Sequence, residues 1–173
     1  MKVVVIGNSG SGKTWLAEQL HTINRDPIIS LDAIYWEQID GDLQKRSCEE
    51  KDSLIKKSKK NISWIVEGVY GDMSMQYFDM ADFLVWIDIE WEICKRRIKM
   101  RAWEDKKYRD SDGFKIKIQE HVEWASEYYN RHDSISRSTH KYLFTEFLGE
   151  KICIKTEEHA RILVKNIKKQ ECL

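Results

Sequence analysis

The sequence has no long run of apolar residues. A helix needs roughly 20 of them in a row to cross a bilayer, and the longest candidate, Phe83–Ile87, ends at Asp88. At the N-terminus a short apolar run leads directly into a glycine-rich segment, without the longer apolar region and the cleavage site of a signal peptide. We therefore expect no membrane partner and a cytoplasmic protein.

Proline, glycine and cysteine are also scarce. One proline and eight glycines in 173 residues exclude a collagen-like or low-complexity chain. The cysteines are Cys48, Cys94, Cys153 and Cys172, which form no CxxC pair and no metal-binding spacing with histidine. The sequence therefore indicates neither a zinc site nor a disulfide framework.

No charge of one sign is in excess, because 29 Lys and Arg residues balance 29 Asp and Glu residues. Binding to nucleic acid without regard to sequence depends on neutralising phosphates and usually needs a basic excess. A nucleic-acid partner is therefore not favoured. The lysines of residues 56–60 leave it open, although such a charge run is typical of a solvated helix face.

The chain does contain enough apolar residues for one well-buried domain. Hydrophobic residues make up 42% of it, and seven are tryptophan, so a disordered chain is excluded. Domains cluster near about 100–150 residues. We predict a single domain over residues 1–173.

Short apolar segments alternate with helical patterns along the sequence. The alternation predicts an α/β fold, in which helices cover both faces of a parallel sheet. The predicted strands are residues 2–6, 28–31, 62–66, 83–89 and 151–155, and the predicted helices include one after Gly12, one over 44–60 and one over 157–168.

Two more helical patterns lie between the fourth and fifth predicted strands. A polar, glycine-terminated stretch, residues 104–113, separates them and has the composition of an exposed loop. We predict a lid-like helical hairpin at about 91–138 with a mobile tip. Its apolar stripes are Trp91, Cys94, Ile98 and Ala102 in the first helix, and Phe114, Ile118, Val122, Ala125 and Tyr129 in the second.

Residues 7–14 match the phosphate-binding pattern GxxxxGK[ST] in full, directly after a predicted strand and before a predicted helix. The glycines let backbone N–H groups converge on phosphate oxygens, and the helix N-terminus adds partial positive charge. Lys13 can reach the β- and γ-phosphates, and Thr14 can ligate Mg²⁺. The predicted loop comprises Gly7, Asn8, Ser9, Gly10, Ser11, Gly12, Lys13 and Thr14.

The remaining sequence narrows the kind of phosphate chemistry. No NKxD-type segment is present, which argues against a GTPase, and the chain has no room for the helical subdomain of a remodelling ATPase. A lid would exclude water from a transferring phosphoryl group. Arg97 and Arg101 lie one turn apart on its first helix and could clamp the β- and γ-phosphates. Alternatively they form a solvated face paired with Glu92 or Glu104.

Two acidic residues, Asp32 and Glu67, each close a predicted strand. Ligands bind at the carboxyl ends of strands in open parallel sheets, so either acid could order water around Mg²⁺. Asp32 could also accept a proton from a substrate hydroxyl. Gly68 would allow a ligand to approach closely. The alternative is that each acid only caps the next turn.

Aromatic and histidine residues give weaker signals. Tyr35 and Trp36 follow Asp32 and either stack on a substrate ring or pack half-buried. The five histidines form no recognisable metal or catalytic spacing, so no role is assigned to them.

The glycine loop, Leu31-Asp32, the segment 64–68 and the arginine helix around 94–101 together resemble the small P-loop kinases of the adenylate and shikimate kinase type. Within these the chain looks most similar to the DNA topology modulation (FlaR-like) proteins. The resemblance implies a three-layer α/β/α sandwich with five parallel strands in the order 2-3-1-4-5 and a helical lid. It further implies ATP and Mg²⁺ at the loop and a small-molecule acceptor beside Asp32.

The sequence departs from these families in two places. Trp15 stands where relatives often carry a second Ser or Thr for the α-phosphate, so we expect nucleotide affinity or geometry to differ. Glu67-Gly68-Val69-Tyr70 stands where FlaR-like proteins tend to have Asp-Gly-Asn-Tyr.

The leading hypothesis is an ATP- and Mg²⁺-dependent kinase that acts on a hydroxyl group of a small molecule, such as a nucleoside or nucleotide. Two alternatives stay open at this point. One is a nucleotide-regulated binding protein that acts on DNA or a protein partner, and the other is an NTPase with water as the acceptor.

Overall fold

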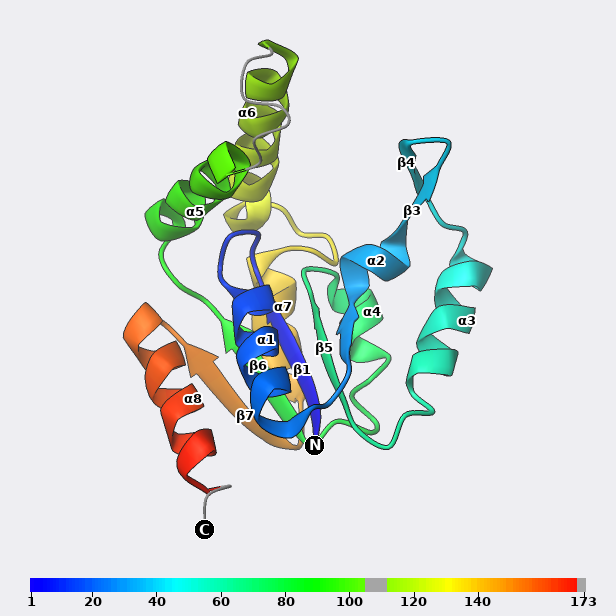
Figure 1. Ribbon diagram of the computed structural model, residues 1–173, viewed down its shortest axis with the longest axis vertical. Helices are drawn as coiled ribbons and strands as arrows, with labels where there is room; N and C mark the ends of the chain where they lie inside the picture. The colour runs from blue at the N-terminus through cyan, green and yellow to red at the C-terminus, as the bar shows by residue number, and fades with distance from the viewer. Residues whose placement is uncertain (105–111, 171–173) are drawn as a thin grey trace.

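A five-stranded parallel sheet lies at the centre of the molecule (Figure 1), seen in a computed structural model that describes residues 1–104 and 112–170. The strands stand in the order β2-β5-β1-β6-β7, so counted along the chain within this sheet they follow 2-3-1-4-5. Val4 of the central strand pairs with Val66 on one side and with Leu84 on the other. The strands are β1 (Lys2–Gly7), β2 (Ile28–Ser30), β5 (Trp64–Gly68), β6 (Phe83–Ile87) and β7 (Glu150–Ile154).

Helices cover both faces of the sheet, which confirms the predicted three-layer α/β class. Because side chains alternate along a strand, Val3 and Val5 face one helical layer while Val4 and Ile6 face the other. One layer holds α1 (Lys13–Asn24) and α8 (Glu157–Gln170). The other holds α2 (Leu31–Tyr35), α3 (Cys48–Ser58), α4 (Gly71–Met75) and α7 (Arg137–Glu146).

The region predicted to be a lid-like hairpin, residues 91–138, contains the helices α5 (Trp91–Glu104) and α6 (Asp112–Ser126), and a short 3-10 helix, η1 (Glu127–Tyr129), follows α6. Ile98, Val122 and Ala125 form a small core between the two helices. The hairpin projects from the end of the molecule opposite the N-terminus (Figure 1). The loop predicted between the helices falls almost entirely outside the described residues.

One expectation, a helix beginning at residue 44, is wrong. Residues there form a separate two-stranded hairpin of β3 (Trp36–Ile39) and β4 (Asp42–Lys45). Asp40 and Gly41 make its turn, with φ angles of 53° and 94°. The helix starts only after Ser47, whose side chain accepts from the Glu50 backbone N–H while the Glu50 carboxylate accepts from the Ser47 backbone N–H.

Smaller differences concern the ends of elements. Glu67 and Gly68 lie inside β5 rather than after it, and Leu31 opens α2 rather than closing β2. The helices α4 and α7 were not predicted from the sequence. Within residues 1–104 and 112–170, no helix has both the length and the apolar character needed to cross a membrane.

Candidate active site

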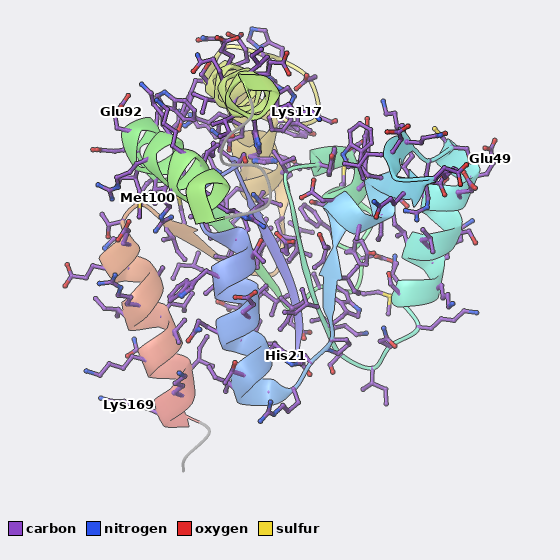
Figure 2. The ribbon with its side chains drawn as sticks, turned by 45° about the horizontal axis from the view of Figure 1, so that its top comes forward. His21, Glu49, Glu92, Met100, Lys117 and Lys169 are labelled. Atoms are coloured by element: carbon purple, nitrogen blue, oxygen red, sulfur yellow. The ribbon has the colours of Figure 1, made fainter. Side chains whose placement is uncertain are left out.

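The glycine loop joins the end of β1 to the start of α1, and its shape depends on glycine. Gly10 and Gly12 adopt left-handed φ angles of 73° and 103°, which side chains other than glycine rarely tolerate. A Cβ atom at Gly10 would overlap the carbonyl oxygen of Cys94, since α5 packs directly on the loop. Figure 2 brings this end forward and shows α5 crossing above the N-terminal end of α1.

Lys13 lies inside this loop and is only 8% exposed. Its Nζ donates to the carbonyl oxygen of Asn8 at 2.9 Å, so the side chain spans its own loop. Burial lowers the pKa of Lys13, while the negative charges of Glu67 and Asp32 act in the opposite direction. A bound anion would favour the charged ammonium in this position.

Ser11 provides a second sign of a ligand-binding loop. Its Oγ is buried and has no hydrogen-bond partner among the described residues. Buried polar atoms are nearly always hydrogen-bonded in folded proteins. A phosphate oxygen in the loop would supply the acceptor that this hydroxyl lacks.

Thr14 and Glu67 bring oxygen atoms from two neighbouring elements together. Thr14 Oγ1 donates to Glu67 Oε2 at 3.4 Å, and Glu67 is only 3% exposed. Mg²⁺ at phosphate-binding sites is usually held by one or two protein oxygens together with phosphate oxygens and water, and this pair fits that donor set. Among the described residues, no group of three or more His, Cys, Asp or Glu side chains is placed to hold a metal by itself.

Asp32 lies in the first turn of α2, where its side chain is exposed. Its carboxylate interacts with the hydroxyl of Tyr70, whose pKa is raised by burial and by the Asp32 charge. The Tyr70 hydroxyl also accepts from Trp36 Nε1 at 3.1 Å. Asp32 therefore stands at the open end of a short hydrogen-bonded chain and within electrostatic range of Lys13.

The two aromatic residues that follow Asp32, Tyr35 and Trp36, lie in different surroundings. Tyr35 stacks on Tyr70 with ring centroids 4.3 Å apart and planes 13° apart, so it packs within the protein. Trp36 keeps 38% of its surface exposed.

Gly68 makes room for the side chain of Leu31, because a Cβ atom at Gly68 would lie 2.6 Å from that of Leu31. Its role in admitting a ligand stays a prediction.

The two arginines predicted to clamp phosphates have different surroundings. Arg97 Nη1 donates to the carbonyl oxygens of Gly10 and Ser11 at 3.2 and 2.8 Å, and its Nη2 pairs with Glu157 at 3.0 Å. Arg97 therefore braces the glycine loop against α8. Arg101 is exposed and within electrostatic range of Lys13. Direct contact of either with phosphates stays a prediction.

The sequence reasoning missed a contact between α6 and the glycine loop. Ser9 Oγ and His121 Nε2 lie 2.8 Å apart, and Asn8 Nδ2 donates to the Ala125 carbonyl oxygen at 3.0 Å. Ser9 and His121 are 112 residues apart in the sequence. Local spacing carried no signal for this pair.

The sequence also carried no sign of a second group of charged residues, which surrounds Asp88 directly after the carboxyl end of β6. Arg137 donates from Nε and Nη2 to the two Asp88 carboxylate oxygens at 2.8 and 2.7 Å, and Lys155 also bonds to Asp88. Burial would raise the pKa of Asp88, but the hydrogen bonds from Arg137 and Lys155 hold it below its ordinary value. Both cations lie over the ring of Trp86.

Solved structures with this architecture include several small-molecule kinases. A shikimate kinase from Acinetobacter baumannii in complex with shikimate superimposes with a TM-score of 0.52 and 11% identity, covering 98% of this chain and 91% of that one. A shikimate kinase from Bacteroides thetaiotaomicron gives 0.51 and 12%, covering 100% and 99%. A gluconokinase from Sinorhizobium meliloti 1021 gives 0.51 and 14%, covering 98% and 96%.

These likenesses show that the chain shares the fold of these kinases. No protein-family model matches the sequence, and no curated protein matches it. The narrower resemblance to DNA topology modulation proteins stays a prediction.

Proposed function

We propose that the protein is a Mg²⁺-dependent kinase that transfers the γ-phosphoryl group of ATP to a hydroxyl group of a small molecule. The observation that carries the proposal is Lys13, a buried lysine within a left-handed glycine loop at the N-terminus of a helix. This arrangement concentrates N–H donors and positive charge on one point, as a polyphosphate requires. Ser11 Oγ and the loop backbone are the neutral donors.

The metal side of the site is formed by Thr14 and Glu67. The Thr14 hydroxyl would ligate Mg²⁺ directly, and the Glu67 carboxylate would hold its water ligands. When bound, the ion would neutralise part of the phosphate charge.

The acceptor side is formed by Asp32 and its neighbours. The acceptor oxygen forms a bond to the γ-phosphorus as the bond from that phosphorus to the bridging oxygen breaks, and ADP leaves. Asp32 takes the proton of the acceptor hydroxyl. Tyr70 orients Asp32, since its hydroxyl interacts with the carboxylate and is held by Trp36.

Residues 91–138 would act as the lid of a single domain that spans 1–173. Its helices already contact the loop through Arg97, Asn8 and Ser9, so the hairpin is placed to exclude water from the transfer. The presence of a shikimate kinase and a gluconokinase among the similar structures supports a small-molecule acceptor.

The test is ADP formation with Mg²⁺ and ATP against a panel of nucleosides, nucleoside monophosphates, hydroxy acids such as shikimate and gluconate, and water alone. We expect one acceptor class to stimulate ADP formation. Lys13→Ala should abolish the stimulation, whereas Lys56→Ala, which removes an exposed lysine of α3, should keep it. Equal rates with every acceptor and with water would overturn the kinase proposal.

A further inference from the structure

His121 lies at the mouth of the glycine loop, although it belongs to α6 of the lid-like hairpin. Its Nε2 is 2.8 Å from Ser9 Oγ. Ser9 is flanked by Asn8 and Gly10 of the loop, and the Asn8 carbonyl oxygen accepts from Lys13 Nζ. Phosphates held by the loop backbone and by Lys13 would therefore lie next to the His121 ring.

The charged groups around His121 come from three different helices. Asp32 belongs to α2, Lys13 to α1 and Arg101 to α5, and all three act electrostatically on the ring. These are the acceptor-side acid, the loop lysine and a lid arginine of the proposed kinase. His121 therefore stands where the nucleotide and the acceptor would meet.

The imidazole is neutral in this surrounding and can change its charge when a ligand arrives. Desolvation lowers the pKa of His121, as do the positive charges of Arg101 and Lys13, while Asp32 opposes them. The side chain is nevertheless exposed, so a ligand can reach it. A polyphosphate placed beside the ring would favour the protonated form.

We propose that His121 binds the terminal phosphate of the nucleotide and takes up a proton from solvent as it does so. The neutral ring has one N–H donor and one acceptor nitrogen, whereas the imidazolium has two donors. One N–H then faces the phosphate in a charge-assisted hydrogen bond. His121 in this way joins α6 to the bound nucleotide, an inference that rests on the proposed binding of ATP.

A purely structural role is the competing explanation. His121 packs edge-on against Trp124 at 5.8 Å between ring centroids, and its contact with Ser9 would serve to dock α6 on the loop. Such a role needs no change of protonation. Proton uptake on nucleotide binding therefore separates the two explanations, and it can be measured without any catalytic turnover.

The experiment is isothermal titration calorimetry of Mg–ATP and of Mg–ADP at pH 7.5, in two buffers with different ionisation enthalpies. We expect the wild type to take up a fraction of a proton with ATP and less with ADP, which lacks the terminal phosphate. His121→Gln should lose the uptake and bind ATP about tenfold more weakly. His121→Arg, with a permanent charge, should recover affinity without proton uptake. The control is His159→Gln, at an exposed histidine of α8, which should behave as the wild type.

Equal proton uptake in the wild type and in His121→Gln, with ATP still bound, would overturn this inference and leave the kinase proposal standing. Absence of ATP binding in the wild type would overturn both. A thermal midpoint of His121→Gln equal to that of the wild type would show that the loss is local to the site.

Discussion

At the scale of single residues, Gly10 couples the glycine loop to the lid-like hairpin. Its φ angle is 73°, and a Cβ atom there would overlap the Cys94 carbonyl oxygen. We predict that Gly10→Ala lowers the free energy of unfolding by about 3 kcal/mol or more, because left-handed strain of about 1–2 kcal/mol adds to the displacement of α5. ATP binding should weaken in parallel. Urea denaturation and calorimetry would measure the two effects.

Gly41 is a matched control for this substitution. Its φ angle is 94°, also left-handed, but nothing lies within 4 Å of the added Cβ position. Gly41→Ala should therefore lower the free energy of unfolding only by the strain of about 1–2 kcal/mol, with ATP binding unchanged. Similar losses in the two variants would show that α5 does not press on the loop.

The ion pairs of Asp88 and Asp79 allow a second comparison at this scale. The Asp88 side chain is 4% exposed in its pair with Arg137, and the Asp79 side chain is 66% exposed in its pair with Lys59. We predict that Asp88→Asn lowers the free energy of unfolding at pH 7 by about 2–3 kcal/mol. Asp79→Asn should change it by less than about 1 kcal/mol.

The pH dependence of the Asp88 effect follows from its pKa, which is held below the ordinary value of 3.8. The stabilisation is complete above the unfolded pKa and is lost as pH falls through the lower folded pKa. Denaturation of both proteins at pH 7 and at decreasing acid pH would test this. A difference between wild type and Asp88→Asn that stays constant into acid would contradict it.

Sequence reasoning at the residue scale succeeds where partners are close in the chain. Lys13 and Asn8 are five residues apart, so the sequence motif that predicts the loop already includes both partners of this hydrogen bond. Arg97 and its loop carbonyls are 86 and 87 residues apart, and only the packing of α5 brings them together. Asp32 and Glu67 were predicted as site residues because strand ends meet at one edge of a parallel sheet, and their roles stay predictions.

At the scale of elements, the three inner strands of the sheet, β1, β5 and β6, were predictable because each is a largely buried apolar run, whereas the edge strands β2 and β7 are short and largely exposed or half-buried. The hairpin of β3 and β4 was missed because it is largely exposed, with Leu43 at 69%. Asp40-Gly41 did carry a turn signal, since two consecutive left-handed residues make the tight turn that this dipeptide favours. Ser47 and Glu50 likewise form the capping box that marks the true start of α3.

A series of buried hydrogen bonds joins three elements and the segment after β5 on the α7 side of the sheet. Trp86 Nε1 of β6 donates to the Tyr128 hydroxyl of η1 at 3.2 Å, and that hydroxyl donates to His140 Nδ1 of α7 at 2.8 Å. His140 Nε2 donates to the Val69 carbonyl oxygen after β5 at 2.9 Å. These contacts satisfy both ring nitrogens of a neutral His140 imidazole. They leave no acceptor for the second N–H group that a protonated ring would carry.

We therefore predict a stability loss in mild acid that originates at His140. Burial lowers the pKa of His140 from 6.5 to about 4. The stability it provides is complete above pH 6.5 and falls as pH drops toward the folded pKa, because only the unfolded chain takes up the proton. Between pH 7 and pH 5 this group alone should account for about 2 kcal/mol of the loss.

Urea denaturation at the two pH values would measure this contribution. His140→Gln should be less stable than the wild type at pH 7 but should lose about 2 kcal/mol less on acidification. His159→Gln, at an exposed histidine, should lose as much as the wild type. An unchanged loss in His140→Gln would place the acid sensitivity elsewhere.

At the scale of the whole molecule, the glycine loop is the point where separate layers meet. Lys13 and Thr14 begin α1, Gly10 touches α5, Asn8 and Ser9 touch α6, and Arg97 carries the connection to Glu157 of α8. A ligand in the loop therefore adds contacts to several elements at once. Binding to the folded state alone stabilises the whole molecule by mass action.

The last prediction concerns this global effect. Mg–ATP at about 100 times its dissociation constant should add about 2.7 kcal/mol to the free energy of unfolding, which for a chain of 173 residues raises the thermal midpoint by about 5–10 °C. Lys13→Ala should show no rise, and His159→Gln should show the full one. Chelating Mg²⁺ should reduce the rise, because Thr14 and Glu67 would no longer share a cation with the phosphates. A thermal midpoint that does not respond to millimolar Mg–ATP would mean that the glycine loop does not bind this nucleotide in the folded protein.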